Sequence, residues 1–305
     1  MSIVRMQGVH KSFRNTIAVD DINLELPAGS MTGFLGPNGA GKSTTIRMLM
    51  SIIRPDRGSI EVLGGDALHN KDHIGYLPEE RGLYGGMKVA GFLGYLATLK
   101  GAGGPDLHKR VQRWLERVAL ADVGNKRCQD LSKGMQQKIQ FIAAVINEPE
   151  LVVLDEPFSG LDPVNADVLQ GLIKEMRAEG RTLLFSTHVL HQAERVCDRF
   201  VMIHQGRKLL DATIGEIRER FDPRTVEVEY LDATDPSGFA GVRRCTALAQ
   251  GGFELALEEG IDAQQAIAQL GRAAPIRRIE LRQVTLEEVF RHLVLEASGP
   301  EAEPA

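Results

Sequence analysis

The sequence is poor in cysteine and aromatic residues and has no long apolar run. Its 305 residues include three cysteines, one tryptophan and 5% aromatic residues in all. Cys128, Cys197 and Cys245 are scattered and form no CxxC pair, which excludes a disulfide framework and a cysteine zinc site and suits a reducing compartment. The longest mainly apolar stretch, 89–99, is shorter than the roughly 20 residues that a spanning helix needs, so no such helix is expected.

The overall charge is weakly negative. Lys and Arg total 36 against 41 Asp and Glu, a net charge of −5, so the chain has no overall field for nucleic acid and no nucleic-acid partner is expected. The first residues, MSIVRMQGVHKSF, contain no apolar segment of signal-peptide length. The length and the 43% apolar content predict a folded cytoplasmic protein of about two domains.

Strand and helix patterns alternate along the first 220 residues. Short β-rich runs predict strands at 3–6, 22–26, 31–35 and 59–63, with a helix over 42–52. Helical periodicity then predicts helices at 89–99, 107–119 and 133–147. The runs 151–157 and 181–188 lack polar alternation, which is typical of buried parallel strands. The pattern predicts an α/β sheet domain with an all-helical insertion at about 80–148.

The remaining chain predicts a small α+β domain. The first domain should end near residue 220, where FDPR is typical of a linker, and the second should cover 225–296. Its last helix is opened by a capping box of Thr285 and Glu288. The expected strands are 225–230, 253–258 and 276–282, and the expected helices are 263–270 and 286–295. The tail, 297–305, is expected to be disordered.

A glycine-rich loop follows the expected strand 31–35. GPNGAGKS, residues 36–43, fits the pattern G-x-x-x-x-G-K-[ST], whose glycines let backbone amides point at phosphate oxygens ahead of a helix N-terminus. Lys42 supplies a positive charge to the β- and γ-phosphates, and Ser43 offers a hydroxyl to Mg²⁺. The predicted nucleotide-binding residues here are Gly36, Pro37, Asn38, Gly39, Ala40, Gly41, Lys42, Ser43 and Thr44.

Two carboxylates end the expected strand 151–157. Open α/β sheets bind ligands at the carboxyl ends of their strands. Adjacent strand residues face opposite ways, but at a strand terminus both can turn toward a metal–phosphate centre. Asp155 is therefore the predicted Mg²⁺ ligand, and Glu156 the predicted base that positions and polarises the attacking water. A solvated strand-end pair is the alternative.

Four further residues lie at the start of a helix or the end of a strand, where a local structural role is one interpretation. Ser132 and Gly134, in LSKGMQQK, begin a helix whose N-terminus can hold an anion, or Ser132 is simply an N-cap. Asp162 precedes Pro163 as an N-cap precedes an N1 proline. His188 closes the strand 181–188 at its carboxyl end, where a structural role is the alternative to a functional one.

The order of these motifs resembles that of ATP-binding cassette ATPases. GPNGAGKST, YLPEE, LSKGMQQK, LVVLDEP, SGLD and STH follow one another within residues 1 to about 220. The resemblance implies a P-loop ATPase fold with a mostly parallel sheet, an N-terminal antiparallel β part and a helical insertion. It also implies hydrolysis of ATP with Mg²⁺, each ATP lying between the P-loop of one subunit and the signature loop of a second.

The resemblance also assigns roles to single residues. It implies that Ser132 and Gly134 reach the γ-phosphate across a dimer, that Asp162 belongs to the interface loop and that His188 contacts the γ-phosphate. Phe13 matches the aromatic residue that stacks on adenine, and a partly exposed strand phenylalanine is the alternative. The expected catalytic residues are Lys42, Glu156 and His188.

The chain departs from the usual family text at three positions. Lys133 and Met135 replace the first glycine and the glutamine of LSGGQ, and Glu79 stands where a glutamine is usual. A carboxylate accepts from water or binds Mg²⁺ but cannot donate, so Glu79 joins Ser43 and Asp155 as a candidate metal ligand. The altered LSGGQ motif and Glu79, together with the closing VTLEEVFRHL, resemble bacterial cassettes of the sodium-extrusion and drug-export type.

Two surfaces have alternative interpretations. In the family, the helical insertion and the loop YLPEERGLY form a groove for a short helix of the membrane partner, although the stripe over 89–99 is equally typical of the insertion's own core. Four arginines of the C-terminal domain form a basic strip, interpreted as a solvated face, with dimer contact or regulation as the alternative. They are Arg272, Arg277, Arg278 and Arg282.

The leading functional hypothesis is the ATP-binding subunit of a transporter. The resemblance implies an exporter, a homodimer or a pair with a second cassette, and a separate transmembrane permease that holds the chain at the inner face of the membrane. A soluble cassette ATPase acting on ribosomes or nucleic acid is the alternative, disfavoured by the single cassette, the missing heptad run and the net charge of −5. A P-loop kinase or GTPase shares only the phosphate loop, and the sequence has no N-K-x-D text.

Overall fold

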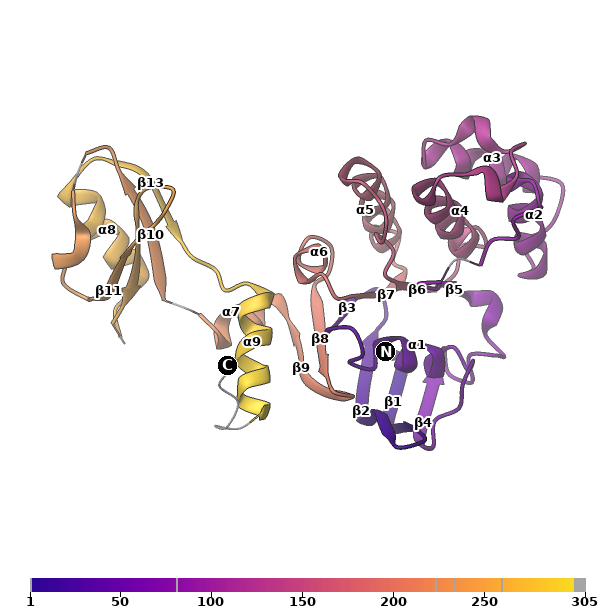
Figure 1. Ribbon diagram of the computed structural model, residues 1–305, viewed down its shortest axis with the longest axis horizontal. Helices are drawn as coiled ribbons and strands as arrows, with labels where there is room; N and C mark the ends of the chain where they lie inside the picture. Colours follow the sequence, from indigo (N-terminus) through magenta and orange to yellow (C-terminus); the bar gives the residue numbers. More distant parts are fainter. Residues whose placement is uncertain (1, 81, 223, 233, 259, 299–305) are drawn as a thin grey trace. The chain divides into compact units, whose positions relative to one another are not determined.

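The structure is a computed structural model, and its chain divides into two units (Figure 1). Of the described residues, those from 2 to 213 and from 294 to 298 form the larger unit, and those within Ile214–Leu293 form the smaller one. None of the described helices combines the length and the apolar character of a membrane span. The described residues are 2–80, 82–222, 224–232, 234–258 and 260–298.

A six-stranded sheet with the order β5-β6-β7-β3-β8-β9 forms the centre of the larger unit. Its strands run parallel except β9, which is antiparallel to β8. Every residue of β3, β6 and β7 is buried, so the buried parallel strands predicted at 151–157 and 181–188 are confirmed. The strands are β3 (Met31–Leu35), β5 (Ile74–Leu77), β6 (Leu151–Asp155), β7 (Thr182–Thr187), β8 (Arg199–His204) and β9 (Arg207–Thr213).

A second, antiparallel sheet with the order β2-β1-β4 packs near the first. It consists of β1 (Ser2–Phe13), β2 (Thr16–Pro27) and β4 (Arg57–Val62). Helix α1 (Lys42–Leu49) contacts β2 and β4 of this sheet and β6 of the other, and its Ile46 is fully buried in their shared core. The loop before α1 is therefore fixed between two sheets.

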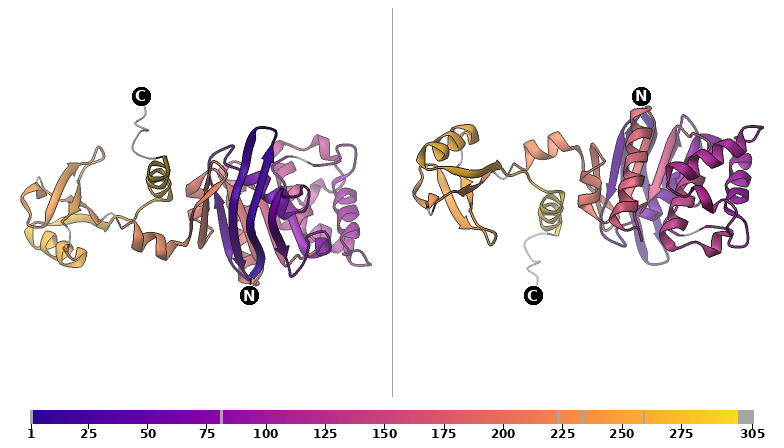
Figure 2. Two further views of the ribbon diagram at one scale, coloured as in Figure 1. Left: turned by 90° about the horizontal axis from the view of Figure 1, so that it is seen from below. Right: turned by 90° about the horizontal axis from the view of Figure 1, so that it is seen from above.

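Helices α2 (Val89–Leu99), α3 (Leu107–Arg117) and α4 (Lys133–Val145) group together beside the central sheet, as the two views of Figure 2 also show. The expected helices 42–52, 107–119 and 133–147 were each too long at the C-terminal end. The chain leaves the right-handed conformation soon after each observed end, because Ser51, Ala119 and Glu148 have φ of 55°, 57° and 55°. The other helices of this unit are α5 (Pro163–Ala178) and α6 (Leu190–Glu194), with 3₁₀ turns at Lys71–His73, Ala121–Val123 and Cys128–Asp130.

The smaller unit contains a four-stranded antiparallel sheet with the order β11-β12-β10-β13. Helix α8 packs on one face, where Val226, Leu255 and Leu270 belong to one buried cluster. At the start of α9, the Thr285 amide donates to Glu288 Oε2 (3.0 Å) and the Glu288 amide to Thr285 Oγ1 (3.2 Å), which confirms the capping box. The elements that begin in this unit are α7 (Ile214–Arg220), β10 (Thr225–Tyr230), β11 (Val242–Ala247), β12 (Phe253–Leu257), α8 (Ala263–Ala273), β13 (Ile276–Leu281) and α9 (Leu286–Ser298), with a 3₁₀ turn at Pro236–Gly238.

The C-terminal tail differs in part from its prediction. Ala297 and Ser298, expected in a disordered tail, belong to the last turn of α9. The helix that opens with the capping box therefore continues for three residues beyond the end that the apolar periodicity predicted. Residues 299–305, the rest of the expected tail, lie outside the described residues.

Candidate nucleotide site

The loop 36–41 runs between β3 and α1 so close to its neighbours that two positions accept only glycine. A Cβ on Gly36 would clash with the carbonyl oxygen of Ile203, and a Cβ on Gly41 with that of Ala18. Gly41 also has φ of 103°, which L side chains rarely adopt. These glycines let the backbone amides at the start of α1 remain open toward a ligand.

Lys42 opens α1 and folds its side chain back into the loop. The residue is 6% exposed, and its Nζ donates to the carbonyl oxygens of Gly36 (2.7 Å) and Pro37 (3.1 Å). Burial lowers the pKa of Lys42, and the nearby carboxylates of Glu156 and Asp155 oppose that change. The ammonium is therefore partly desolvated, in a place where phosphate oxygens would be stronger partners than carbonyl groups.

A cavity of about 260 Å³ joins the loop to the carboxyl ends of two strands of the six-stranded sheet, β5 and β6. It brings together the loop residues and three carboxylates predicted from the sequence. Its lining comprises Ala18, Asn38, Gly39, Gly41, Lys42, Ser43, Thr44, Glu79, Asp155 and Glu156. The predicted loop residues Gly36, Pro37 and Ala40 do not line it, and Ala40 is buried with its carbonyl oxygen accepting from the Gly206 amide.

Asp155, the last residue of β6, offers an oxygen without a protein partner. Its Oδ1 is buried and makes no hydrogen bond within the described part of the chain, and burial raises the pKa of Asp155. Together with the Ser43 hydroxyl in the same lining, this oxygen suits Mg²⁺, which prefers hard oxygen ligands. The described residues hold no group of three or more His, Cys, Asp or Glu arranged for a metal, so phosphate oxygens would complete the coordination.

Glu156 has an unusual backbone conformation that turns it from the strand. Its φ is 51°, in the left-handed region, and its amide donates to the Ser186 carbonyl oxygen at 3.0 Å. Its carboxylate accepts from the Thr187 hydroxyl at Oε2 (3.1 Å) and from the His188 amide at Oε1 (2.9 Å). His188 Nδ1 lies 2.6 Å from the same Oε1. Glu156 is thus oriented by Thr187, the last residue of β7, and by His188, which follows it. Of the predicted catalytic residues, Lys42 and Glu156 line the cavity, and His188 contacts Glu156.

Besides the three loop residues and His188, four predicted site residues do not line this cavity. Phe13 is 48% exposed at the end of β1, with Lys11 Nζ 5.5 Å from its ring centroid. Ser132 Oγ accepts from the Met135 amide (3.3 Å) and therefore caps α4, where Gly134 occupies the first turn. Asp162 similarly caps α5.

Sequence reasoning missed two residues of the site. Ala18 lines the cavity and places its carbonyl oxygen against Gly41, but an alanine within a β-rich run gives no signal of this role. Thr187 orients Glu156, and its signal was present, since a hydroxyl side chain precedes His188 at a strand's carboxyl end.

A glycine loop, a buried lysine and two carboxylates at the ends of parallel strands define a P-loop nucleotide-binding protein. The chain belongs to the ATP-binding cassette family, since residues 19–159 match the family described as ABC transporter. Residues 213–294 match the C-terminal domain described as ATP-binding protein DrrA1-3-like. Cassettes of this family hydrolyse ATP, so the chain is an ATPase, and the predicted fold and family are confirmed.

Relatives of known class extend over nearly the whole chain. The ABC transporter ATP-binding protein YhaQ of Bacillus subtilis is 39% identical over 290 residues, which cover 94% of this chain and 97% of that protein. The daunorubicin/doxorubicin resistance ATP-binding protein DrrA of Streptomyces peucetius is 29% identical over 94% of this chain and 91% of its own. A solved ATP-binding subunit of an ABC transporter is 31% identical with a TM-score of 0.68, covering 72% of this chain and 93% of that one. The chain is therefore the ATP-binding subunit of an ABC transporter.

Proposed function

We propose that two cassettes, two copies of this chain or this chain and a sister, close on two ATP molecules and thereby drive export through a separate membrane permease. One observation carries the proposal. The cavity gathers Lys42, Asp155 and Glu156, whereas the amide-rich start of α4 at Ser132 and Gly134 does not line it. A second cassette can bring that helix N-terminus to the exposed side of the phosphates. Because ATP then favours the closed pair, its binding shifts an equilibrium between open and closed states.

Each of the cavity residues has a separate role in hydrolysis. Lys42 leaves the loop carbonyl groups for the β- and γ-phosphates, and Ser43 and Asp155 hold Mg²⁺. When bound, Mg²⁺ neutralises phosphate charge. Glu156 orients a water for in-line attack and accepts its proton, and Glu79 faces the same cavity as an acceptor for water or as a metal ligand.

His188 has two roles in this proposal. Its bonds to Glu156 orient the carboxylate, and its half-exposed ring is placed to contact the γ-phosphate. Phe13 stacks on adenine from the end of β1, where its ring is exposed. Ser132, Gly134 and Asp162 act on the nucleotide of the second cassette.

An exposed aromatic patch on α2 and the loop before it is the proposed contact with the permease. Tyr84 and Tyr95 are 53% and 45% exposed, and their rings lie 6.2 Å apart. The Tyr84 ring also packs edge-on against the ring of Phe92, with 5.8 Å between the ring centroids. Aromatic residues are enriched at protein interfaces. We place the chain at the cytoplasmic face of the membrane through this patch.

The two predicted domains have different roles. Residues 1–220 act as the ATPase cassette and residues 225–296 as an accessory domain, and the separate unit Ile214–Leu293 supports this assignment. The export direction is supported by the drug-resistance relative that aligns over both domains. That relationship favours a transporter over a soluble cassette ATPase acting on ribosomes or nucleic acid.

Light scattering after size exclusion tests the pairing. Glu156→Gln keeps the shape of the side chain but removes the base, so the variant should bind ATP with Mg²⁺, turn over far more slowly than the wild type and remain paired. Lys42→Ala should stay unpaired. A Glu156→Gln protein that retains ATP but pairs neither with itself nor with a sister cassette, or that hydrolyses ATP at the normal rate, contradicts the proposal.

A further inference from the structure

Strand β13 is an open edge of the sheet in the smaller unit. It pairs with β10 on one side, and no described strand pairs with its other side. Arg278, Glu280 and Leu281 are exposed along it. An edge strand offers unpaired backbone groups to another chain unless its sequence opposes pairing.

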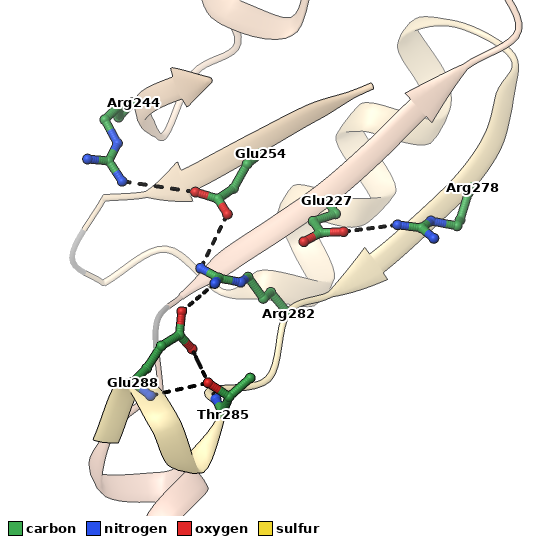
Figure 3. A network of polar contacts seen from close by, with 7 residues as sticks. All are labelled: Glu227, Arg244, Glu254, Arg278, Arg282, Thr285 and Glu288. Atoms are coloured by element: carbon green, nitrogen blue, oxygen red, sulfur yellow. Dashed lines mark hydrogen bonds and ion pairs between the residues drawn. The ribbon is translucent and has the colours of Figure 1, made fainter. Parts of the chain in front are cut away.

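The sheet face opposite α8 carries a regular set of ion pairs (Figure 3). Arg278 Nη2 lies 3.0 Å from Glu227 Oε2, linking β13 to β10. Arg282 Nη1 lies 3.2 Å from Glu254 Oε2 on β12, and Arg282 also bonds to Glu288 at the start of α9. The glutamates of β10 and β12 on this face therefore have arginine partners.

Glu280 differs from these glutamates. It stands directly opposite Glu227 in the ladder between β13 and β10, so its nearest cross-strand neighbour has the same charge. Within the described part of the chain, its carboxylate has no hydrogen bond or ion pair. The open edge thus carries one uncompensated negative charge, two residues from the arginine at position 278.

We propose that β13 pairs antiparallel with β13 of a second copy of this chain, about a twofold axis at Ile279. The backbone restricts the register, and the charges at positions 278 and 280 choose within that restriction. The Arg282 amide donates to the Thr225 carbonyl oxygen (2.8 Å), so the alternation of an antiparallel ladder turns the backbone groups of Ile279 and Leu281 away from β10. Those outward groups meet their counterparts in the registers that set the outward-facing residues of the two copies opposite each other, and pairing about Ile279 is one of these registers.

The same register resolves the charge on Glu280. Pairing about Ile279 places Glu280 of each copy opposite Arg278 of the other, on the face that carries the ion pairs. The other edge, β11, lacks this self-complementarity, because Arg244 and Thr246 flank its centre at Cys245. Charge complementarity therefore selects β13 as the self-pairing edge.

This interface is small and acts by proximity. A six-residue strand buries far less than the roughly 1,200 Å² of a stable interface, so the contact is weak alone and sensitive to salt. It raises the effective concentration of one cassette near another and needs no nucleotide. It extends the proposed function but does not depend on it.

Disulfide trapping tests the register in the full chain. The background is Cys245→Ser, with Lys42→Ala added and no nucleotide present, so failure of ATP-driven pairing cannot affect the result. Arg278→Cys protein and Glu280→Cys protein are prepared separately and mixed. Residues opposite each other in a pair without mutual hydrogen bonds lie roughly 4.5 Å apart at Cα, within disulfide reach. We expect covalent dimers in the mixture and at least about tenfold fewer in either protein alone.

A charge exchange tests the chemistry without cysteine. Sedimentation equilibrium should show dimerisation weakened about tenfold or more by Glu280→Arg, less by Glu280→Gln, and restored when the Glu280→Arg chain is mixed with an Arg278→Glu chain. Because both positions are exposed, circular dichroism should show the fold unchanged. Equal trapping in the mixture and the single proteins, or a dimer unaffected by Glu280→Arg, overturns the proposal.

Discussion

The Thr187 hydroxyl donates to Oε2 of Glu156 at 3.1 Å, and its oxygen accepts from the Val189 amide at 3.1 Å. Thr187 is buried at the end of β7, so this hydroxyl has a fixed direction. It holds one carboxylate oxygen of Glu156 while the His188 amide holds the other. The structure therefore fixes the candidate base from both sides before any substrate binds.

Replacing Thr187 separates this positioning role from packing. Thr187→Val keeps the volume but loses the donor, and a hydrogen bond to a charged group contributes about 1.5–3 kcal/mol, so kcat should fall roughly 10- to 100-fold. The KM for ATP should change little. Thr187→Ser keeps the hydroxyl and should restore most of kcat, and equal losses in both variants would show that packing alone matters.

Asp155→Asn tests the predicted Mg²⁺ ligand. Asparagine fills the same space without the charge, so half-maximal hydrolysis should require a several-fold higher Mg²⁺ concentration, measured by titrating steady-state activity. The variant should also be at least as thermally stable as the wild type, because burial raises the pKa of Asp155 and its ionised form is disfavoured in the fold. Unchanged Mg²⁺ dependence would remove Asp155 from this role.

Asp56 predicts a pH dependence of stability. Lys11 Nζ and the Ser12 amide bond to its carboxylate at 2.6 and 2.8 Å, and chiefly the bond from Lys11 lowers the pKa of Asp56 from 3.8 to about 2. Since the fold favours the ionised form, this contribution is present above pH 4 and disappears as the pH falls toward 2. The difference in urea midpoint between wild type and Asp56→Asn should therefore narrow between pH 6 and pH 3. Asp167→Asn, on the exposed side of α5, serves as the control, and a constant difference for Asp56→Asn contradicts the assignment.

The aromatic patch predicts a loss of coupling without a loss of hydrolysis. Tyr95→Ser should leave the ATPase activity of the purified cassette within about twofold. Tyr95 lies on α2, far from the phosphate loop in the sequence, and its side chain is half exposed. Recovery of the chain with membranes that contain its permease should fall several-fold. Leu68→Ser removes another exposed apolar side chain, outside the patch, and should have no effect on recovery. Normal membrane recovery of Tyr95→Ser would place the contact elsewhere.

The sequence predicted best where chemistry and periodicity coincide. The loop 36–43 and the strand 151–155 each combine an apolar run with functional residues at its end, and the structure brings both to one cavity. Helix α2 matches its predicted bounds because its apolar spacing changes sharply at both ends. The capping box at Thr285 could also be predicted, because the spacing of Thr285 and Glu288 determines two hydrogen bonds.

Features that depend on tertiary contacts could not be predicted from the sequence. Strand β11 was missed because VRRCTA has little apolar content, and it forms by pairing with β12. The left-handed backbone at Ser51 and Ala119 ended two helices that periodicity extended. The role of Ala18 arises from the close approach of its carbonyl oxygen to Gly41, which no side-chain pattern records.

Equilibrium binding of ATP with Mg²⁺ to the full chain tests the central claim most directly. Lys42→Ala removes the buried ammonium that the loop holds for phosphate oxygens, whereas Lys133→Ala removes an exposed ammonium at the start of α4. We predict that the wild type and Lys133→Ala bind ATP with similar affinity in the absence of a second cassette, and that Lys42→Ala binds about tenfold more weakly or worse. Equal ATP affinity of Lys42→Ala and the wild type, or a wild-type chain that retains no ATP, would contradict the account.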